Sequence, residues 1–263
     1  MDRSVSIILP YYNRKELIIH TLRSFELLYV NKNVEIVIVD DGSNKQNMLE
    51  DIVSNFNLNI KLIRIGNKNG INPCYPYNVG VRHSTGDIIV LSSPETLHTK
   101  SIYEVSNNFE LLNEDSYLFF SVFCITDEKM LKEIIEQDYS VELFREHFHK
   151  NLGELGYEYN NKYGSWYTHS KYKKTDLNFL SVMTSKNYKE LSGFDERFRF
   201  GTGLDDNEFS ERCRQLIDKF IYYDDMEAIH INHEQVSVGN QVSNMGLYNT
   251  KSNYEKNDKW GLL

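Results

Sequence analysis

Polar and acidic residues follow three short apolar runs in the first hundred positions of the chain. Residues 10–13 read Pro-Tyr-Tyr-Asn, residues 40–43 read Asp-Asp-Gly-Ser, and residues 92–95 read Ser-Ser-Pro-Glu. Carboxylates and amides at such positions can hydrogen-bond a base or a ribose, and ligands of open parallel sheets bind beyond the carboxyl ends of the strands. Residues 41–43 alone fit a turn with a helix N-cap equally well. Three such ends together favour a ligand site.

A second group of residues is acidic and rich in glycine. Residues 193–198 read Gly-Phe-Asp-Glu-Arg-Phe, and residues 201–209 read Gly-Thr-Gly-Leu-Asp-Asp-Asn-Glu-Phe. Glycines let a substrate approach the backbone closely, and carboxylates beside apolar partners can supply a general base. A plain helix start, in which acidic residues favour the helix dipole, is the alternative.

Histidines and aromatic residues form two further candidates. If residues 227–232 are a strand, His230 and Asn232 share one face and His233 falls on the other. A histidine near a strand end is commonly structural, but a metal required by the carboxylates would give it a role. In residues 164–169, Trp166 and His169 could contact a sugar from a lid-like loop, with ordinary surface packing as the alternative.

The first half of the chain alternates strand-like and helix-like patterns. Runs that are apolar at nearly every position predict strands buried on both faces, and helical spacing predicts helices between them. The predicted strands are 5–9, 34–39, 60–65 and 87–91, and the predicted helices are 14–30, 43–54 and 72–83. This alternation indicates an α/β protein with a largely parallel sheet and right-handed crossovers.

The second half is less regular. The patterns predict helices at 99–112, 127–150 and 204–217, strands at 117–125, 179–184 and 220–231, and a long loop at 151–177. No linker or repeat divides the chain. We therefore expect one domain, 1–263, with a nucleotide-sugar half (1–98), a helical segment and lid-like loop (99–177), an acceptor half (178–240) and a polar tail (241–263).

Composition excludes several classes of protein. The chain has 263 residues, of which 40% are hydrophobic and 25% charged, as is usual for a globular protein. A net charge of −9 argues against a nucleic-acid binder held by phosphate contacts. The three cysteines form no C-x-x-C pair, and no apolar stretch approaches the length of a membrane span. We expect a soluble cytoplasmic protein, with peripheral membrane association left open.

Taken together, the motifs resemble known enzymes. Residues 10–14, residues 39–43 and the Asn-Val-Gly and Thr-Gly-Asp-Ile-Ile runs at 78–80 and 85–89 look like family 2 glycosyltransferases of the GT-A fold. Residues 193–209 resemble the acceptor-side motif of galactosyltransferases, polypeptide N-acetylgalactosaminyltransferases and bacterial chondroitin polymerases. The resemblance covers about residues 4–95 and 178–233, and it implies a GT-A fold with a mostly parallel central sheet flanked by helices.

The resemblance also implies roles for particular residues. Pro10, Tyr11 and Asn13 would line the base and ribose pocket, and Asp40 would hydrogen-bond the nucleobase.

On the acceptor side, the resemblance implies that Asp206 is the general base. Asp205, which replaces the family's usual Glu, would orient the acceptor, and His230 matches the metal-binding histidine.

The sequence departs from the family at two positions. The usual Asp-x-Asp after the fourth strand is replaced by Ser-Ser-Pro-Glu, so we expect Glu95 to serve as the carboxylate ligand, as in relatives with Asn-Pro-Glu. Weakened or lost metal binding is the alternative. Tyr77 stands where an Arg usually precedes Asn-x-Gly.

The resulting hypothesis is an inverting hexosyltransferase that uses Mn²⁺ or Mg²⁺ held by Glu95 and His230. Its donor would be a nucleoside-diphosphate sugar, and its acceptor a hydroxyl of a glycan or lipid-linked glycan in polysaccharide biosynthesis. Two rivals stay open: a catalytically inactive sugar-nucleotide-binding relative and a sugar nucleotidyltransferase. The second usually needs a Gly-rich, basic first loop, which residues 10–14 lack.

Overall fold

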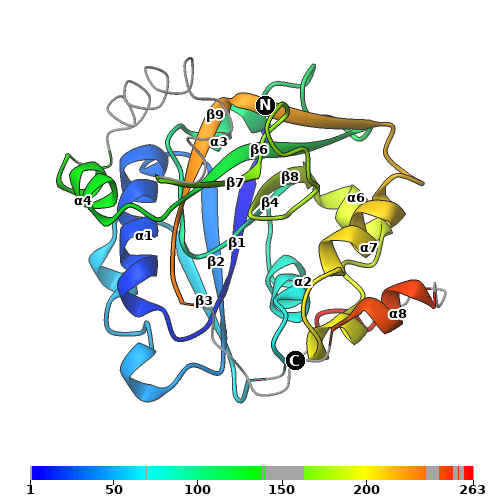
Figure 1. Ribbon diagram of the computed structural model, residues 1–263, viewed down its shortest axis with the longest axis horizontal. Helices are drawn as coiled ribbons and strands as arrows, with labels where there is room; N and C mark the ends of the chain where they lie inside the picture. Colours follow the sequence, from blue (N-terminus) through cyan, green and yellow to red (C-terminus); the bar gives the residue numbers. More distant parts are fainter. Residues whose placement is uncertain are drawn as a thin grey trace.

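The computed structural model describes residues 2–68, 70–137, 139, 163–234, 243–250, 254 and 258–262. Within these residues, nine strands form one sheet in the order β3-β2-β1-β4-β8-β6-β9-β5, and β7 pairs with β6 (Figure 1). The strands are β1 (Val5–Tyr11), β2 (Val34–Asp41), β3 (Ile60–Ile65), β4 (Ile88–Ser92), β5 (Thr96–Leu97), β6 (Ser116–Ile125), β7 (Gly164–Thr168), β8 (Leu180–Thr184) and β9 (Lys219–Ile231).

Most of the described strands run in one direction. β3, β2, β1 and β4 are mutually parallel. β8 is antiparallel to both β4 and β6, so β6 again follows the direction of β4, and β9 is parallel to β6. Only β5, β7 and β8 among the described strands run the other way. The predicted α/β class with a mostly parallel sheet is confirmed.

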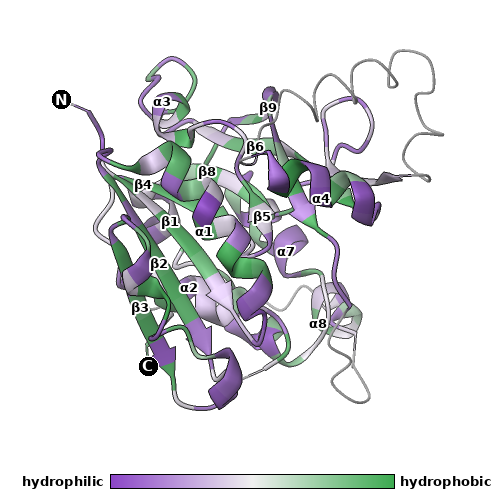
Figure 2. Ribbon diagram, turned by 90° about the vertical axis from the view of Figure 1, so that its left-hand side faces the viewer, coloured by the Kyte–Doolittle hydropathy of each residue, from purple (hydrophilic) through white to green (hydrophobic). Residues whose placement is uncertain are grey.

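Helices cover both faces of the sheet. In Figure 1, α1 and α4 lie on one side and α2, α6, α7 and α8 on the other. The described helices are α1 (Lys15–Tyr29), α2 (Cys74–Arg82), α3 (Ile102–Ser106), α4 (Glu128–Glu136), α6 (Ser185–Glu190), α7 (Asp205–Cys213) and α8 (Met245–Asn249). Because both faces are covered, the central strands are apolar over most of their length and polar at the carboxyl end of β2, as the green strand with its purple end in Figure 2 shows.

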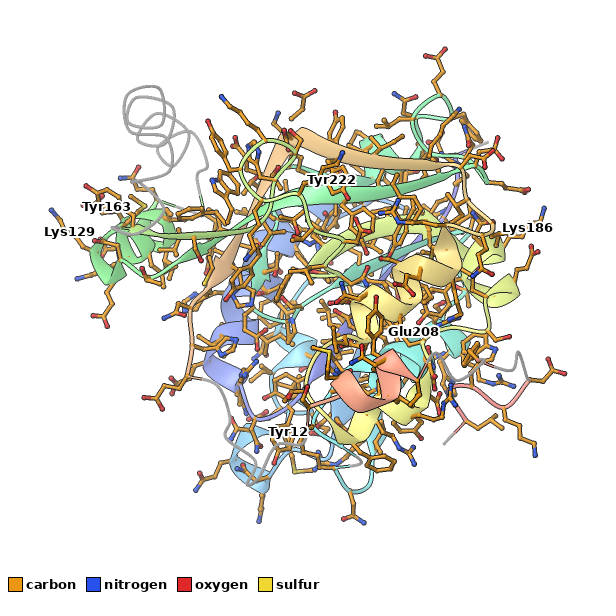
Figure 3. All side chains as sticks on the ribbon, turned by 45° about the vertical axis from the view of Figure 1, so that its right-hand side comes forward. Tyr12, Lys129, Tyr163, Lys186, Glu208 and Tyr222 are labelled. Carbon is orange, nitrogen blue, oxygen red and sulfur yellow. The ribbon has the colours of Figure 1, made fainter. Side chains whose placement is uncertain are left out.

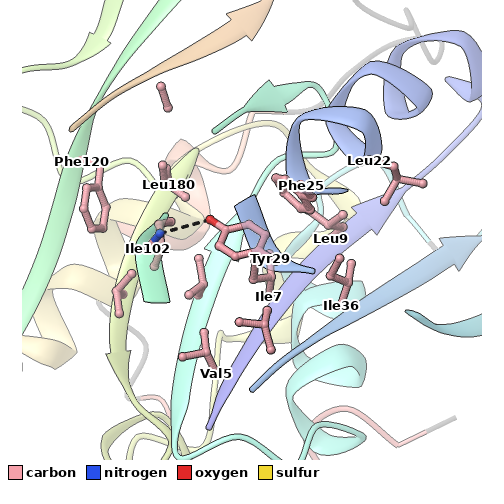
Figure 4. Packing of buried hydrophobic residues seen from close by; sticks show 14 of the residues in the cluster. Val5, Ile7, Leu9, Leu22, Phe25, Tyr29, Ile36, Ile102, Phe120 and Leu180 are labelled. Atoms are coloured by element: carbon pink, nitrogen blue, oxygen red, sulfur yellow. Dashed lines mark hydrogen bonds between the residues drawn. The ribbon is translucent and has the colours of Figure 1, made fainter. Parts of the chain in front are cut away.

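Alternate residues of each central strand enter separate hydrophobic clusters. Ile7 and Ile36 pack in the cluster beneath α1, whereas Ile8 and Val37 pack in the cluster beneath α2. This period of two is the geometry of a strand buried on both sides. In the first cluster, Tyr29 ends α1 and its hydroxyl accepts a hydrogen bond of 3.2 Å from the backbone N–H of Ile102 (Figure 4).

Several predicted boundaries are wrong, and asparagines explain two of them. The helix expected at 43–54 is two short 3₁₀ turns, because the Asn44 side chain accepts hydrogen bonds from the backbone N–H groups of Gln46 and Asn47. The helix expected at 99–112 is only α3, since the Asn108 side chain caps Glu110 and Leu111 in the same way. Local bonds of this kind compete with helix formation.

The expected long loop at 151–177 also needs correction. Gly164–Thr168 form β7, which pairs antiparallel with β6, while residues 151–162 lie outside the described residues. The helix expected at 127–150 begins as predicted with α4, but its continuation beyond residue 137 also falls almost entirely outside them.

Candidate active site

A cleft of about 620 Å³ lies beyond the carboxyl ends of β1, β2 and β4. Its walls include residues from both halves of the chain, among them Pro10, Tyr11, Glu95, Asp206 and His230. The hypothesis required Glu95, Asp206 and His230 to converge, and the fold brings all three into this one cavity. Asp205 lines it as well.

Three potential metal ligands meet on one wall of the cleft. One ligand atom from each of Glu95, His230 and His233 lies within 4.8 Å of the other two. Glu95 Oε2 and His230 Nε2 are 4.0 Å apart, and both side chains are nearly fully buried. A carboxylate with two imidazoles is a donor set that divalent transition metals accept.

The sheet register explains why Glu95 meets His230. Thr96 pairs with His230 across β5 and β9, and the Ile231 N–H donates to the Glu95 carbonyl at 2.9 Å. The turn before β5 is fixed from the other side, since the Thr21 hydroxyl donates to the Pro94 carbonyl at 2.8 Å. The carboxylate is therefore held by backbone pairing of two distant segments.

The protonation state of His230 suits a metal ligand. Burial, together with the nearby His233 and Arg14, lowers the pKa of His230 to about 3, so its ring is neutral at physiological pH. Its Nδ1 is buried and has no hydrogen-bond partner. A neutral imidazole can donate a nitrogen lone pair to a metal, and Nε2 is the ring nitrogen that lies nearest the Glu95 carboxylate.

Arg14 supplies positive charge at the same place. Its guanidinium lies 2.5 Å from Glu95 Oε1 and lines the cleft. It therefore occupies one oxygen of Glu95, and the other oxygen faces His230.

The same cleft is lined by two adjacent carboxylates at the start of α7. Asn72 Nδ2 donates to Asp205 Oδ1, and Asn178 Nδ2 donates to Asp206 Oδ1, both at 2.6 Å. Leu204 precedes the helix with a left-handed φ of 67°, which turns the chain sharply into these residues. Loss of water contact and the charge of Asp205 raise the pKa of Asp206 well above its usual range. A carboxylate with a raised pKa suits proton transfer near neutral pH.

The nucleotide-side residues divide into those that face the cleft and those that support it. Asp41 and Lys68 line the cleft and form an ion pair of 3.1 Å, with the Lys68 ammonium 3.8 Å from the ring centre of Tyr12 (labelled in Figure 3).

Asp40 and Asn13 are not among the lining residues, contrary to the prediction. Asp40 is buried and accepts bonds from the Ser43 N–H and from Arg64. Asn13 joins two strand ends: its N–H donates to the Ser43 hydroxyl, and its side chain accepts from the Asn44 N–H.

The predicted lid residues lie elsewhere. Trp166 is only 2% exposed and packs edge-on against Phe123 of β6, and neither Trp166 nor His169 lines the cleft. Both belong to the β7 hairpin region, where the indole fills a hydrophobic cluster. The run Trp-Tyr-Thr at 166–168, of residue types that favour strands, was the sequence signal.

Sequence reasoning also missed residues that the fold brings to the cleft. His233 was expected opposite His230, but β9 ends at Ile231, and the two rings lie 5.4 Å apart. Arg14 lies in the recognised run at 10–14 but was given no role, and Lys68, Asn72 and Asn178 gave no motif signal.

Known proteins share both sequence and fold with this chain. Residues 6–115 match the family described as Glycosyl transferase family 2. Chondroitin synthase of Escherichia coli is 27% identical over 260 residues, covering 88% of this chain and 34% of that protein. The first relatives found are longer, since the chain spans only 18% to 34% of their length.

Solved structures agree on the fold. Staphylococcus aureus TarS 1-349 in complex with UDP-GlcNAc superposes with a TM-score of 0.60 at 16% identity, covering 90% of this chain and 61% of that one. A mannosyltransferase from Pyrobaculum calidifontis in complex with GDP-Man and Mn²⁺ gives 0.55 at 17% identity, covering 91% and 59%. Residues 6–115 thus match family 2 glycosyltransferases in sequence, and the chain has the GT-A fold.

Proposed function

We propose that this protein transfers a sugar from a UDP-sugar to a hydroxyl group of a glycan or lipid-linked glycan. The observation that carries the proposal is one cleft that holds both a cluster of metal-ligand type, Glu95, His230 and His233, and the carboxylate pair of Asp205 and Asp206. A UDP-sugar is favoured over other donors because TarS, with the same fold, was solved with UDP-GlcNAc.

The cation site would be formed by Glu95, His230 and His233. Their chemistry fits Mn²⁺, which is also present in the mannosyltransferase of the same fold. A divalent cation there supplies charge that favours departure of a nucleoside diphosphate. The neutral ring of His230 and the 4.0 Å approach of its Nε2 to Glu95 Oε2 support this assignment.

Asp206 would act as the general base. It removes the proton of the acceptor hydroxyl while that oxygen attacks the anomeric carbon, and the bond to the diphosphate breaks with inversion of configuration. Asp205 would orient the acceptor. A cysteine nucleophile is disfavoured, because burial raises the pKa of the thiols of Cys74, Cys124 and Cys213.

The donor nucleotide would occupy the other end of the cleft. Pro10, Tyr11 and Asp41 form its wall, with Lys68 available for a phosphate or a base carbonyl. Asn13 would act indirectly by joining the ends of β1 and β2. Under this proposal residues 1–98 serve the donor and residues 178–240 the acceptor, within one domain.

We further propose that the enzyme works in the cytoplasm. Within the described part of the chain, no helix has the length and apolar character needed to cross a bilayer.

The test is a donor panel of UDP-, GDP- and dTDP-sugars, assayed with Mn²⁺ and with EDTA. We expect nucleoside diphosphate release from a UDP-sugar that requires the metal. Binding of the nucleotide without any turnover would favour an inactive relative. Pyrophosphate release from a nucleoside triphosphate would instead identify a nucleotidyltransferase.

A further inference from the structure

Asn178 joins the acceptor side of the cleft to the core of the sheet. It lies just before β8, is 3% exposed and lines the cleft. Its side-chain amide donates to Asp206 Oδ1 at 2.6 Å. The residue thus touches the proposed base directly, although no sequence motif points to it.

The orientation of this amide is fixed by two hydroxyl groups. The Tyr117 hydroxyl from β6 donates to Asn178 Oδ1, and the Ser181 hydroxyl from β8 donates to the same oxygen at 2.6 Å. A carboxamide has one accepting oxygen and one donating nitrogen. Because the oxygen is engaged by two donors, the nitrogen must face Asp206.

The backbone of Asn178 is held as well. Its carbonyl accepts a bond of 3.2 Å from the hydroxyl of Tyr77, which is buried in α2. Residues of α2, β6 and β8 therefore hold Asn178 in place. A hydrogen-bond donor held in this way can orient a carboxylate without moving during a reaction.

We propose that Asn178 is the positioning residue of Asp206, holding its carboxylate in one orientation and favouring the ionised form. The inference rests on the proposed role of Asp206 as the base. Hydrogen bonds to a carboxylate lower its pKa. Here the bonds from Asn178 oppose the effects of burial, of Asp205 and of Asp176, all of which raise it.

The charged and titratable groups around Asp206 agree with this role. Asp205 precedes it on α7, and Asp176 is paired with Arg214. The two tyrosines nearby, Tyr77 and Tyr117, are buried and have raised pKa values, so they stay neutral. Among the leading influences on the pKa of Asp206, the hydrogen bonds from the side chain and backbone of Asn178 are the ones that lower it.

The neighbouring carboxylate shows the same arrangement. Asn72 donates to Asp205, and its own side-chain oxygen accepts the N–H of Cys74 at 2.9 Å. Asp205 and Asp206 thus each accept a hydrogen bond from a side-chain amide whose own oxygen is hydrogen-bonded.

The experiment is a titration of Asp206 by NMR of isotope-labelled aspartate, with the signal assigned by its loss in Asp206→Asn. In Asn178→Ala we expect the Asp206 pKa to rise by about one to two units, the effect of removing a hydrogen bond to a charged group. The acid limb of the pH profile for UDP release should move by the same amount.

Two further variants keep the test decisive. If Asn178→Ala does not fold, Asn178→Asp retains an acceptor for Tyr117 and Ser181 and should raise the Asp206 pKa further, because a second carboxyl replaces the donor. Asn187→Ala is the matched control: Asn187 is a buried amide of α6 that donates to the Glu114 carbonyl and does not line the cleft. It should leave the titration unchanged.

The outcomes separate this inference from the proposed function. An unchanged Asp206 pKa in the Asn178 variants, or an equal shift in Asn187→Ala, would overturn the positioning role whatever the activity. A shift confined to the Asn178 variants in a protein that transfers no sugar would support the positioning role and reject the transferase proposal.

Discussion

At the scale of single residues, the raised pKa of Asp206 lowers the stability of the fold and also suits this residue to proton transfer. Its carboxyl group keeps its proton to a higher pH in the folded chain than in the unfolded chain, because its folded pKa is raised. As pH rises from the ordinary carboxyl pKa to the folded pKa, the unfolded chain loses this proton first. Folding stability therefore falls across that window, while the fraction of active base increases.

Asp206→Asn should reverse both effects. We expect the rate of sugar transfer to fall by about 10²- to 10⁴-fold, with nucleotide binding retained. Stability to urea should exceed that of the native protein, by a margin that grows with pH across the same window. Asp218→Asn, at an exposed position, is the control. Undiminished turnover in Asp206→Asn would show that the base is another group.

Site residues that lie in recognisable motifs were predictable from the sequence. The residues that hydrogen-bond to them were not. Asp206 and His230 could be found because each stands in a recognisable run of residues. Asn178 and Asn72 are isolated asparagines, whose importance comes only from contacts with residues 28 and 133 positions away. Asp40 was chosen over Asp41 because the sequence does not tell which of two adjacent carboxylates lines the cleft.

At the scale of elements, the close packing of α2 on the sheet sets the shape of the cleft floor. Gly80 lies in α2, and a Cβ atom there would meet Ile8 Cγ2 at 2.3 Å and Val39 Cγ2 at 3.1 Å. Only a residue without a side chain allows this approach. The neighbouring Asn78 then reaches across to accept bonds from the Tyr188 hydroxyl and the Phe194 N–H.

Gly80→Ala should therefore destabilise the fold. The added methyl group overpacks the contact between α2 and β1, at a cost of about 1–3 kcal/mol. Urea unfolding followed by circular dichroism would measure it. Gly246→Ala in α8 is the matched control, since a Cβ there meets no atom within 4 Å. Equal losses in the two variants would mean that packing is not the cause.

Elements with strong apolar patterns were predicted well, and those with many asparagines were not. β3 was placed correctly at Ile60–Ile65, and α1 and β2 to within about two residues, because buried strands and amphipathic helices leave a clear pattern. β1 continues through Pro10 to Tyr11. Beyond Ile8 it pairs only with β2, so a residue without a backbone N–H is tolerated there. The helices expected at 43–54 and 99–112 failed where side-chain amides capped the backbone.

At the scale of the whole molecule, the cleft depends on segments from both halves of the chain. Glu95 comes from the first half and His230 from the second, and β5 and β9 bring them together. The order of the motifs was enough to predict the GT-A fold and the convergence of these residues. The third potential ligand, His233, could not be placed, because its position depends on where β9 ends.

Ligand binding to such a composite site should stabilise the whole fold. We expect Mn²⁺ with UDP to raise the melting temperature by more than the sum of their separate shifts, because in a shared site each ligand strengthens binding of the other. Differential scanning fluorimetry at fixed protein concentration checks this. Mn²⁺ and UDP acting independently would argue against a shared site.

The central claim is that Glu95, His230 and His233 hold a divalent cation, and Mn²⁺ binding measured by electron paramagnetic resonance tests it most directly. We predict one tight site in the native protein, weakened by roughly tenfold or more in Glu95→Gln and in His230→Gln, and unchanged in Glu128→Gln, at an exposed position of α4. Equal Mn²⁺ binding in all four proteins, or none in the native protein, would contradict the account.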